Sequence, residues 1–593
     1  MVACAIMSLQ GEQTHKPPGQ RHDTSEARGW PDPGMRSRMP VRKFQLLAFE
    51  DIMLLRGDLL GAGSLTWLLR DHAALLFPAW LFSGWKGEST RGREAWPAQT
   101  LMSLLLLRYS EAGLTRVGAV RRAGADAMWR SALRLPWDVK PPDEKTLREF
   151  EAFMAAPCPN VGIPRVLVLF EHITRLGLDR DIVDHAAAWV IDSTPMWCYG
   201  AVLCTVNLLG EGVRSLAKRF ATARRVPLAQ VAVEWDAPLV VAKSTKGHFD
   251  GTDWSDLFAR SGVLKRLIEL AMRGVERVMS GIERGEVRTN KHLPLRRLCW
   301  NLMRVVTEDL EVTAEGTVKV LHRTTSSRLI SLTDPEAQHF RKSASKVCTG
   351  FKLHVLGDAL SGLILALSVT PGGHHDSTEA HPLIARAKAL RKDLREVLAD
   401  AAYGGMPVRN EVQQATGVTL IAPPLSISKS GDGLGKQDFD VDFKTMTATC
   451  PGGVATDSWK MTKREDDRMG ATFAWPKGSE TRCTCADKCP AHRRPPLKTG
   501  GTRSPLRRLL LHPDEQELRR LRAEWQTPAI RERYRVRTQG ERLINEMTRR
   551  GARHASGWGL SHAVLQAHCI AAVNNLRLLA RTLAEASQRQ RAA

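Results

Sequence analysis

Three acidic residues in this chain have the settings that metal-assisted phosphate chemistry requires. Asp192 and Asp400 each follow a short apolar run, so each carboxylate is predicted at the carboxyl end of a strand. Glu541 lies in a basic segment with a helical pattern. Carboxylate oxygens are the ligands that Mg²⁺ prefers, and two such ions can clamp the attacking and leaving oxygens of a phosphodiester displacement. The three acids therefore predict one site for two Mg²⁺ ions, in which Mn²⁺ can substitute.

Two further residues precede Glu541 at spacings that matter. Tyr534 and Arg537 lie seven and four residues before it, so on one continuous helix all three would share a face. An arginine on that face would suit a DNA phosphate. The structural alternative is a surface aromatic residue beside an ordinary ion pair between Arg537 and Glu541. Glu546 is the rival for the third acid, five residues further on and rotated away from that face.

Taken alone, an aspartate at a strand end often only caps the following helix or turn. The order of the motifs is more specific. They are Asp192-Ser-Thr-Pro, the stretch from Gly350 to Asp376, Asp400-Ala-Ala-Tyr-Gly, and a Tyr-x2-Arg-x3-Glu signature that ends at Glu541. Together they resemble the DDE transposases of bacterial insertion sequences. The subgroup they resemble most is named after insertion sequence eleven-eighty-two and is related to the insertion sequence four type.

The resemblance implies a ribonuclease-H-like core in which Asp192, Asp400 and Glu541 bind the metal ions. It implies a transposase that cuts DNA at the ends of its element and joins the 3′-hydroxyl to target DNA, working as a homo-oligomer that holds both ends. Two positions depart from the pattern: Thr548 stands where the signature has a lysine, and Cys204 stands where relatives often have an aspartate.

Two other functions compete with this one. A decayed or repurposed transposase would bind DNA without cutting it, and a plain nuclease of the same core would cut DNA without joining it. The presence of all three acids favours an enzyme over the inactive binding protein. Strand transfer, which a nuclease does not perform, separates the remaining two.

The charge of the chain favours a polyanionic partner. The net charge is +23, and residues 491–560 hold 17 Lys and Arg against 7 Asp and Glu, a net of +10 around Glu541. Arg549 and Arg550 are predicted to follow a DNA backbone there, whereas a solvated helical face is the usual meaning of such a run. Only 6% of residues are aromatic, which argues against a platform that stacks single-stranded bases.

No stretch of the sequence has the features of a membrane anchor or a secretion signal. The richest apolar stretch, residues 73–85, is interrupted by Pro78, and the apolar residues near the N-terminus lack a preceding basic region. We therefore expect no membrane association and a cytoplasmic, nucleoid-associated protein.

The predicted fold class is α/β, a ribonuclease-H-like mixed sheet flanked by helices. Five domains or segments are predicted: a disordered basic arm at 1–43; a helical N-terminal domain at 44–157; the catalytic core at 158–423, with a helical insertion at about 207–312; a small, mostly β insertion at 424–510; and C-terminal helices at 511–593 that complete the core.

The helical N-terminal domain contains a candidate helix-turn-helix between Ser110 and Leu133. Arg121 and Arg122 would face outward from it and bind the DNA ends. An ordinary helical hairpin with a basic face is the alternative, and the two interpretations are nearly balanced.

Two further groups could contribute to a site. Cys450, Cys483, Cys485 and Cys489, with His492 nearby, are candidate ligands for a structural Zn²⁺, although their spacing departs from the usual zinc-ribbon pattern, and reduced thiols are the alternative. Lys352 and the pair His375-Asp376 are candidates for supporting the acidic site, and roles in a turn or on a strand surface are at least as compatible with the sequence.

Overall fold

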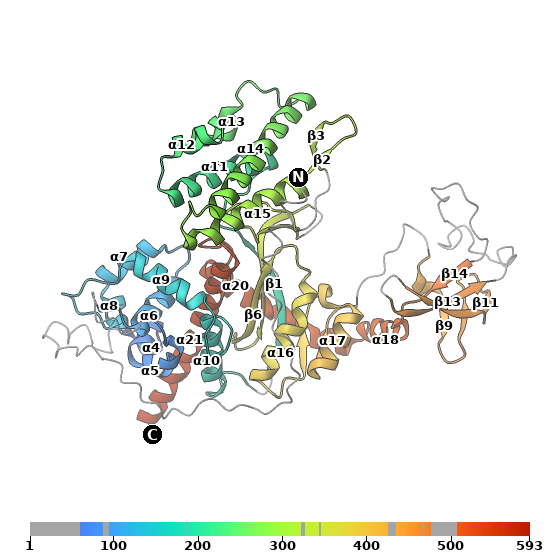
Figure 1. The fold of residues 1–593 in the computed structure, drawn as a ribbon. Helices are drawn as coiled ribbons and strands as arrows, with labels where there is room; N and C mark the ends of the chain where they lie inside the picture. The colour runs from blue at the N-terminus through green and yellow to red at the C-terminus, as the bar shows by residue number, and fades with distance from the viewer. Residues whose placement is uncertain are drawn as a thin grey trace.

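A mixed six-stranded sheet lies at the centre of the computed structural model (Figure 1). The structure describes residues 60–86, 94–184, 187–321, 327–342, 345–424, 434–464, 467–475 and 507–592. The predicted basic arm at 1–43 and the start of the predicted N-terminal domain lie outside these residues.

The sheet combines antiparallel and parallel pairing. Its strands are β1 (Trp189–Trp197), β4 (Gln338–Arg341), β5 (Val347–Asp358), β6 (Ile364–Pro371), β7 (Glu396–Leu398) and β8 (Thr419–Ile421). One edge of β5 pairs antiparallel with β1, and its other edge pairs antiparallel with β4 and β6. On the far side of β1, β7 and then β8 add in parallel. This mixed order is compatible with the predicted ribonuclease-H-like core.

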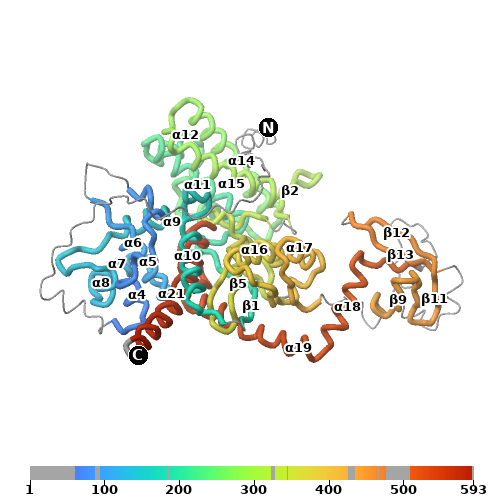
Figure 2. Tube along the Cα trace, turned by 90° about the horizontal axis from the view of Figure 1, so that it is seen from below, coloured from blue at the N-terminus to red at the C-terminus, as the bar shows by residue number. Residues whose placement is uncertain are grey.

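Helices cover both faces of the sheet because its strands are apolar on both sides. Alternate side chains, such as Ile191 and Val397, pack with α16 (Ala380–Leu390) and α17 (Met406–Thr416). Their neighbours Val190 and Leu398 point the other way and pack with Ile530. On this second face lie α10 (Arg165–Leu178), α19 (Pro528–Arg535) and the long α21 (Leu560–Ala592), and Figure 2 shows α16 and α17 on the side away from α10 and α21.

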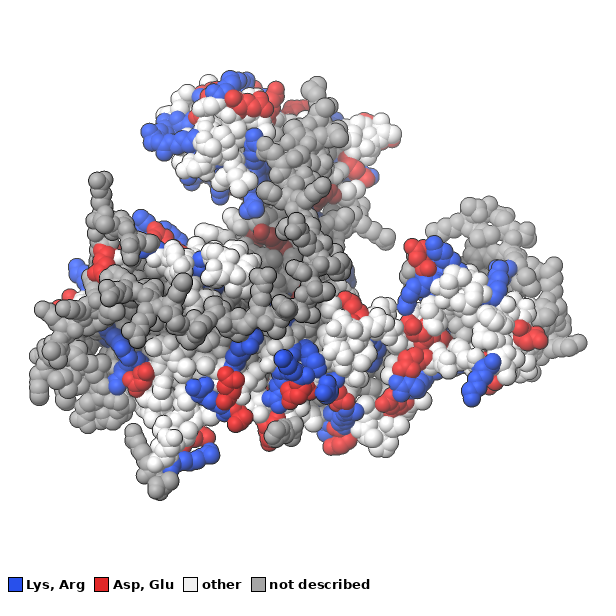
Figure 3. All heavy atoms as spheres, turned by 60° about the horizontal axis from the view of Figure 1, so that its bottom comes forward, with Lys and Arg blue, Asp and Glu red and all other residues white. Residues whose placement is uncertain are grey.

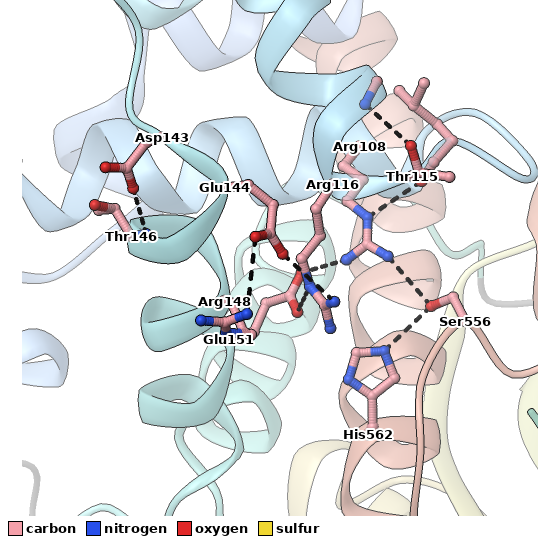
Figure 4. A network of polar contacts seen from close by, with 12 residues as sticks. Arg108, Thr115, Arg116, Asp143, Glu144, Thr146, Arg148, Glu151, Ser556 and His562 are labelled. Carbon is pink, nitrogen blue, oxygen red and sulfur yellow. Dashed lines mark hydrogen bonds and ion pairs between the residues drawn. The ribbon is translucent and has the colours of Figure 1, made fainter. Parts of the chain in front are cut away.

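The N-terminal helices pack against the sheet through α10 and α21. They are α4 (Leu65–Asp71), α5 (Ala73–Leu76), α6 (Ala98–Tyr109), α7 (Arg116–Ala125), α8 (Ala127–Leu133) and α9 (Glu144–Ala155). Their buried leucines and aromatics share one hydrophobic core with α10, α21 and β5. A buried polar network also joins them to the C-terminal part of the chain: Glu151 is paired with Arg108 and Arg116, and Arg108 and His562 both contact Ser556 (Figure 4).

In the sequence, a helical unit lies between β1 and the other strands of the sheet. It contains α11 (Thr205–Arg224), α12 (Leu228–Glu234), α13 (Thr245–His248), α14 (Leu257–Glu283) and α15 (His292–Glu308), followed by the hairpin of β2 (Leu310–Val312) and β3 (Val318–Val320). These elements have a hydrophobic core of their own, and in Figure 1 they stand above the sheet.

A second unit, made of short strands, lies between β8 and the C-terminal helices. Its strands are β9 (Asp440–Asp442), β10 (Thr447–Thr449), β11 (Ala455–Thr456), β12 (Trp459–Lys463), β13 (Met469–Trp475) and β14 (Arg507–Leu510). They pack around a small core that includes Phe473 and Trp475. In Figure 1 this unit lies to one side, beyond α18 (Glu515–Trp525), which leads back to α19.

No helix within the described ranges is both long enough and apolar enough to span a bilayer.

Candidate active site

Asp192 and Asp400 lie at the same level of two adjacent strands. The parallel strands β1 and β7 pair at Val190 and Leu398, and each aspartate comes two residues after its member of that pair. Side chains two apart on a strand share a face, so Asp192 points to the side that α19 covers. Asp400 follows the end of β7 and accepts the backbone N–H of Ala402 at 2.9 Å. The fold thus brings together two acids that are 208 residues apart in sequence.

Asp192 lies within β1, which continues to Trp197 in its pairing with β5, so the prediction that Asp192 ends a strand is wrong. The segment after α19 contacts both Asp192 and the end of β7. Arg537 Nη2 donates to Asp192 Oδ2 at 3.2 Å. The Tyr534 hydroxyl donates to the backbone oxygen of Ala399 at 2.8 Å, directly before Asp400. Four of the residues singled out in the sequence therefore lie together. Arg537, which the sequence directed at a phosphate, contacts an acid of the site.

Negative charge exceeds positive charge around Asp192 and Asp400. Burial raises the pKa of Asp192, Arg537 opposes the rise, and the charges of Asp400 and Asp376 add to it. Burial also raises the pKa of Tyr534, with contributions from both Asp192 and Asp400. Within the described part of the chain, Asp400 has no ion-pair partner. Bringing like charges together in this way disfavours their charged forms unless a cation compensates.

Glu541 reaches the same strand through its neighbour. It is the first residue of α20 (Glu541–Met547), and Gly540 packs so tightly on β1 that a Cβ atom there would lie 2.6 Å from Val190 Cγ1. The Glu541 side chain is exposed and has no ion-pair partner among the described residues. Glu546, its rival, is already paired with Arg550 at 2.6 Å and lies 3.7 Å from Arg549.

The continuous helix on which Tyr534, Arg537 and Glu541 would share a face is interrupted, which corrects that expectation. Between α19 and α20 lies the 3₁₀ segment η9 (Val536–Gly540), and α20 ends in a π-helical turn, η10 (Thr548–Ala552). Because a 3₁₀-helix has three residues per turn, the i,i+4 spacing of Arg537 and Glu541 does not place them on one face. Arg537 turns to Asp192, and Glu541 is exposed.

The donor set suits a hard divalent cation. Asp192 and Asp400 offer carboxylate oxygens in a region of excess negative charge, which is the chemistry that Mg²⁺ prefers. In the part of the chain that the structure describes, no three acidic, histidine or cysteine side chains converge into a metal-binding group. The two aspartates are therefore candidate cation ligands, and Glu541 does not join them in such a group within the described residues.

The sequence comparison bears directly on this geometry. Residues 321–576 match the family model described as the transposase DDE domain. This match supports a DDE transposase. The matched region includes β5 to β8, Asp400 and Glu541, whereas β1 and Asp192 precede it. Comparisons with curated proteins and with solved structures found no match.

Sequence reasoning gave Tyr403 no role beside these acids, and it named Asp376 only as a candidate for supporting them. Tyr403 follows Asp400 by three residues, is fully buried, and its hydroxyl has no hydrogen-bond partner among the described residues. Burial raises its pKa well above the usual value, and Asp376, Asp400 and Asp192 raise it further. Asp376 itself bonds both Lys352 and Ser193. The Asp-Ala-Ala-Tyr motif signalled the first, and the His375-Asp376 pair the second.

The arginines predicted to bind DNA differ in their freedom. In η10, the Arg549 side chain is 76% exposed, whereas the Arg550 side chain is 10% exposed and forms an ion pair with Glu546. In the N-terminal helices, Arg121 is exposed and has no ion-pair partner among the described residues. Arg122 instead pairs with Glu111 and with Asp126, the latter at 2.9 Å.

Charge on the C-terminal helices is balanced locally rather than gathered into one basic surface. Several arginines pair with glutamates of the same helix, as Arg520 does with Glu517 and Arg535 with Glu532. Figure 3 shows Lys and Arg interspersed with Asp and Glu over the described residues of the face in view. Because the net +10 of the sequence segment already subtracts these acids, the pairing distributes its positive charge without removing it.

The cysteine cluster is described only in part. Cys450 is a buried free thiol in the core of the small β unit, where its backbone closes a tight turn with Gly453 and Val454. Cys483, Cys485, Cys489 and His492 lie outside the described residues. The Zn²⁺ site therefore stays a prediction.

Proposed function

We propose that this chain is a DDE transposase that cuts DNA at the ends of an insertion sequence and joins the freed 3′-hydroxyl to target DNA by two-metal phosphoryl transfer. The observation that carries the proposal is the placement of Asp192 within β1 and of Asp400 just after the end of the adjacent β7, beside the segment with Tyr534 and Arg537. The match of residues 321–576 to the transposase DDE domain supports it.

The proposed reaction has two displacements at phosphorus. Water first attacks the phosphodiester at the element end, the P–O bond to the element's 3′ oxygen breaks, and that oxygen leaves as a 3′-hydroxyl. The 3′-hydroxyl then attacks a target phosphodiester in line, forms the new P–O bond and expels a target 3′-hydroxyl. No covalent bond between protein and DNA is required.

The residues have separate tasks in this scheme. Asp192, Asp400 and Glu541 would hold the cations, with Glu541 approaching from the start of α20. Bound Mg²⁺ ions, or Mn²⁺ in their place, would activate the attacking oxygen and neutralise the charge that develops on phosphorus oxygens. Arg537 would exchange its contact with Asp192 for the scissile phosphate once cations compensate the acids. Tyr534 keeps the Asp400 turn in place through its bond to Ala399.

The partners follow from the reaction. The substrate is double-stranded DNA, both the terminal inverted repeats of the element and the target. Holding two ends requires more than one active site, so we propose a homo-oligomer on DNA. We further propose that the chain belongs to the subgroup named after insertion sequence eleven-eighty-two, that it works at the bacterial nucleoid, and that the helices before residue 157 recognise the element ends.

A strand-transfer assay tests this function. The purified chain is incubated with Mg²⁺, a labelled duplex carrying the DNA that flanks its coding region, and a supercoiled target. We expect cut ends and joined products from the natural chain, and neither from Asp192→Asn or Asp400→Asn, which keep shape and remove charge. Cut ends without joined products would indicate a nuclease, and binding without cutting would indicate an inactive DNA-binding protein. Either result would reject the proposal.

A further inference from the structure

The face of β1 opposite Asp192 carries a second polar group, made of Ser193, Lys352 and Asp376. We propose that these three residues form a positioning network that holds the Asp192 carboxylate in the orientation needed for cation binding. The inference rests on the proposed function, because it assigns support of the same site. It concerns residues that the metal ions themselves do not touch.

The contacts form one continuous chain. Lys352 Nζ donates to Asp376 Oδ1 at 2.7 Å, and Ser193 Oγ donates to Asp376 Oδ2 at 2.7 Å. The backbone N–H of the same serine donates to Asp192 Oδ1 at 2.8 Å. Ser193 therefore links the two carboxylates: its side chain is anchored on Asp376, and its amide orients the oxygen of Asp192.

The pair of Lys352 and Asp376 is largely buried, and Lys352 has a second hydrogen-bond partner. The side chains of Lys352 and Asp376 are only 15% and 18% exposed. Lys352 lies opposite Pro195 in the β1–β5 pairing and also donates to the backbone oxygen of His374 at 2.7 Å. It thus ties β5 to the turn that carries Asp376. A hydrogen-bonded pair in such a setting constrains geometry far more than an exposed ion pair does.

Asp376 is an anchor and not a further cation ligand, and its contacts decide between the two. Both of its oxygens already accept a hydrogen bond, one of them from a lysine ammonium group. Burial works to raise its pKa, and the bonds from Lys352 and Ser193 outweigh that effect and lower it. Its partner Ser193 lies on the opposite face of β1 from Asp192, since adjacent side chains on a strand alternate.

The site needs an anchor of this kind because its acids repel one another. Asp192 and Asp400 lie on adjacent, paired strands, and repulsion between like charges favours rotation of each carboxylate away from its neighbour. A hydrogen bond from a fixed amide opposes that rotation. In metal sites, loss of such supporting partners weakens metal affinity or activity by roughly 10- to 100-fold.

Direct measurement of Mn²⁺ binding tests the network without relying on activity. Isothermal titration calorimetry on the full chain, free of DNA, gives the Mn²⁺ affinity of the natural protein and of Asp376→Asn, Ser193→Ala and Lys352→Met. We expect Asp376→Asn to weaken Mn²⁺ binding by about 10-fold or more. Ser193→Ala, the mildest change, should weaken it in the same direction. The double variant, Asp376→Asn with Ser193→Ala, should bind Mn²⁺ no more weakly than Asp376→Asn alone, because both changes remove the same series of contacts.

A matched control separates the network from ion pairs in general. Glu311 and Lys319 form a pair of the same 2.7 Å length on the β2–β3 hairpin, with side chains 42% and 40% exposed. Glu311→Gln should leave Mn²⁺ affinity unchanged. Thermal unfolding of every variant shows whether it is folded at the temperature of the titration, and Ser193→Ala keeps the test open if Asp376→Asn is not.

The possible results point to different conclusions. Unchanged Mn²⁺ affinity in folded Asp376→Asn and Ser193→Ala, with binding lost in Asp192→Asn, overturns the network and leaves the metal site standing. Additive losses in the double variant also overturn it, because they place the two residues in separate roles. If Asp192→Asn binds Mn²⁺ as well as the natural chain, the metal site of the proposed function itself fails.

Discussion

Two acidic residues of this chain, Glu151 and Asp192, are each paired with arginine, and the pairs differ in how fully they are compensated. Glu151 is 3% exposed and lies between Arg108 and Arg116, with the Arg116 contact at 2.6 Å (Figure 4). Asp192 is 19% exposed, and among the described residues its ion-pair partner is Arg537, at 3.2 Å, while burial and then the charges of Asp400 and Asp376 raise its pKa.

The difference distinguishes a structural carboxylate from a reactive one. Two guanidinium groups surround Glu151 and join α6, α7 and α9, so its carboxylate is fully paired and stabilises the packing of these helices. At Asp192, by contrast, carboxylates that repel one another lie close together, and this repulsion lowers the stability of the fold. A site that is under-compensated in this way gains stability when a cation binds.

Removing the buried acid should have the largest effect on folding. Glu151→Ala leaves two arginines next to each other with no partner between them, and breaking a buried pair in this way costs about 3–5 kcal/mol. Urea denaturation of the natural chain and the variant measures the change in the free energy of unfolding. A loss below about 1 kcal/mol would mean that the network contributes little to folding, and the comparison would lose its structural half.

Acid should destabilise the fold through two buried histidines of α21, His562 beside the Glu151 network and His568 against Phe170. Burial lowers the pKa of both His562 and His568 to about 3, from an ordinary value of 6.5. Between these pKa values the unfolded chain binds protons at the histidines and the folded chain does not. Their contribution to the free energy of unfolding is therefore fully present above pH 6.5 and is lost as the pH decreases toward 3. Each histidine contributes about 1.4 kcal/mol per pH unit in that window.

Stability measured from pH 7 to pH 4 checks this prediction. His568→Gln should reduce the steepness of the loss by the contribution of one histidine. The same steepness in both proteins would contradict the assigned pKa.

Neutralising Asp192 should not destabilise the fold, in contrast to the removal of Glu151. Because burial and like charge raise the pKa of Asp192, its ionised form costs stability at neutral pH. Asp192→Asn should therefore leave the free energy of unfolding unchanged or raise it by up to about 1 kcal/mol, while abolishing cleavage. Denaturation at pH 7 without divalent cations makes the test, and a loss comparable to that of Glu151→Ala would assign Asp192 a structural role.

The smallest effect should separate two neighbouring arginines on α7. Arg121 is exposed without an ion-pair partner in the described part of the chain, whereas Arg122 is held by Glu111 and Asp126. If these helices bind the element ends, Arg121→Ala should lower the salt dependence of binding by about one phosphate contact. Arg122→Ala should change it less. Equal effects would mean that the Arg122 pairs open on DNA.

Local patterns in the sequence predicted the end of β7 before Asp400, because an apolar run followed by Asp is visible without the fold. They placed the end of β1 too early, at Asp192, because its long-range pairing with β5, which extends β1 to Trp197, is not visible in the sequence. They also predicted that Tyr534 and Arg537 would lie near the acids, through the spacing of the signature. The bond from Arg537 to Asp192 was not predictable, because it depends on the 3₁₀ segment that ends at the close approach of Gly540 to Val190.

The contact between Ser193 and Asp376 spans 183 residues and follows no periodicity. A count of charges also does not show which of them pair. The net +10 segment predicted a basic surface, and the structure pairs many of its arginines with glutamates on the same helix. Composition fixes how much charge a segment has, and only the fold decides how much of it is free.

The central claim, that Glu541 joins Asp192 and Asp400 in one site, is tested most directly by comparing two glutamates of α20. Glu541 is exposed and unpaired within the described residues, whereas Glu546 is occupied by Arg550. Mg²⁺-dependent strand transfer should be lost in Glu541→Gln and retained in Glu546→Gln, with DNA binding nearly equal in both. An active Glu541→Gln beside an inactive Glu546→Gln would show that the wrong acid was chosen, and full activity in both would contradict the three-carboxylate site.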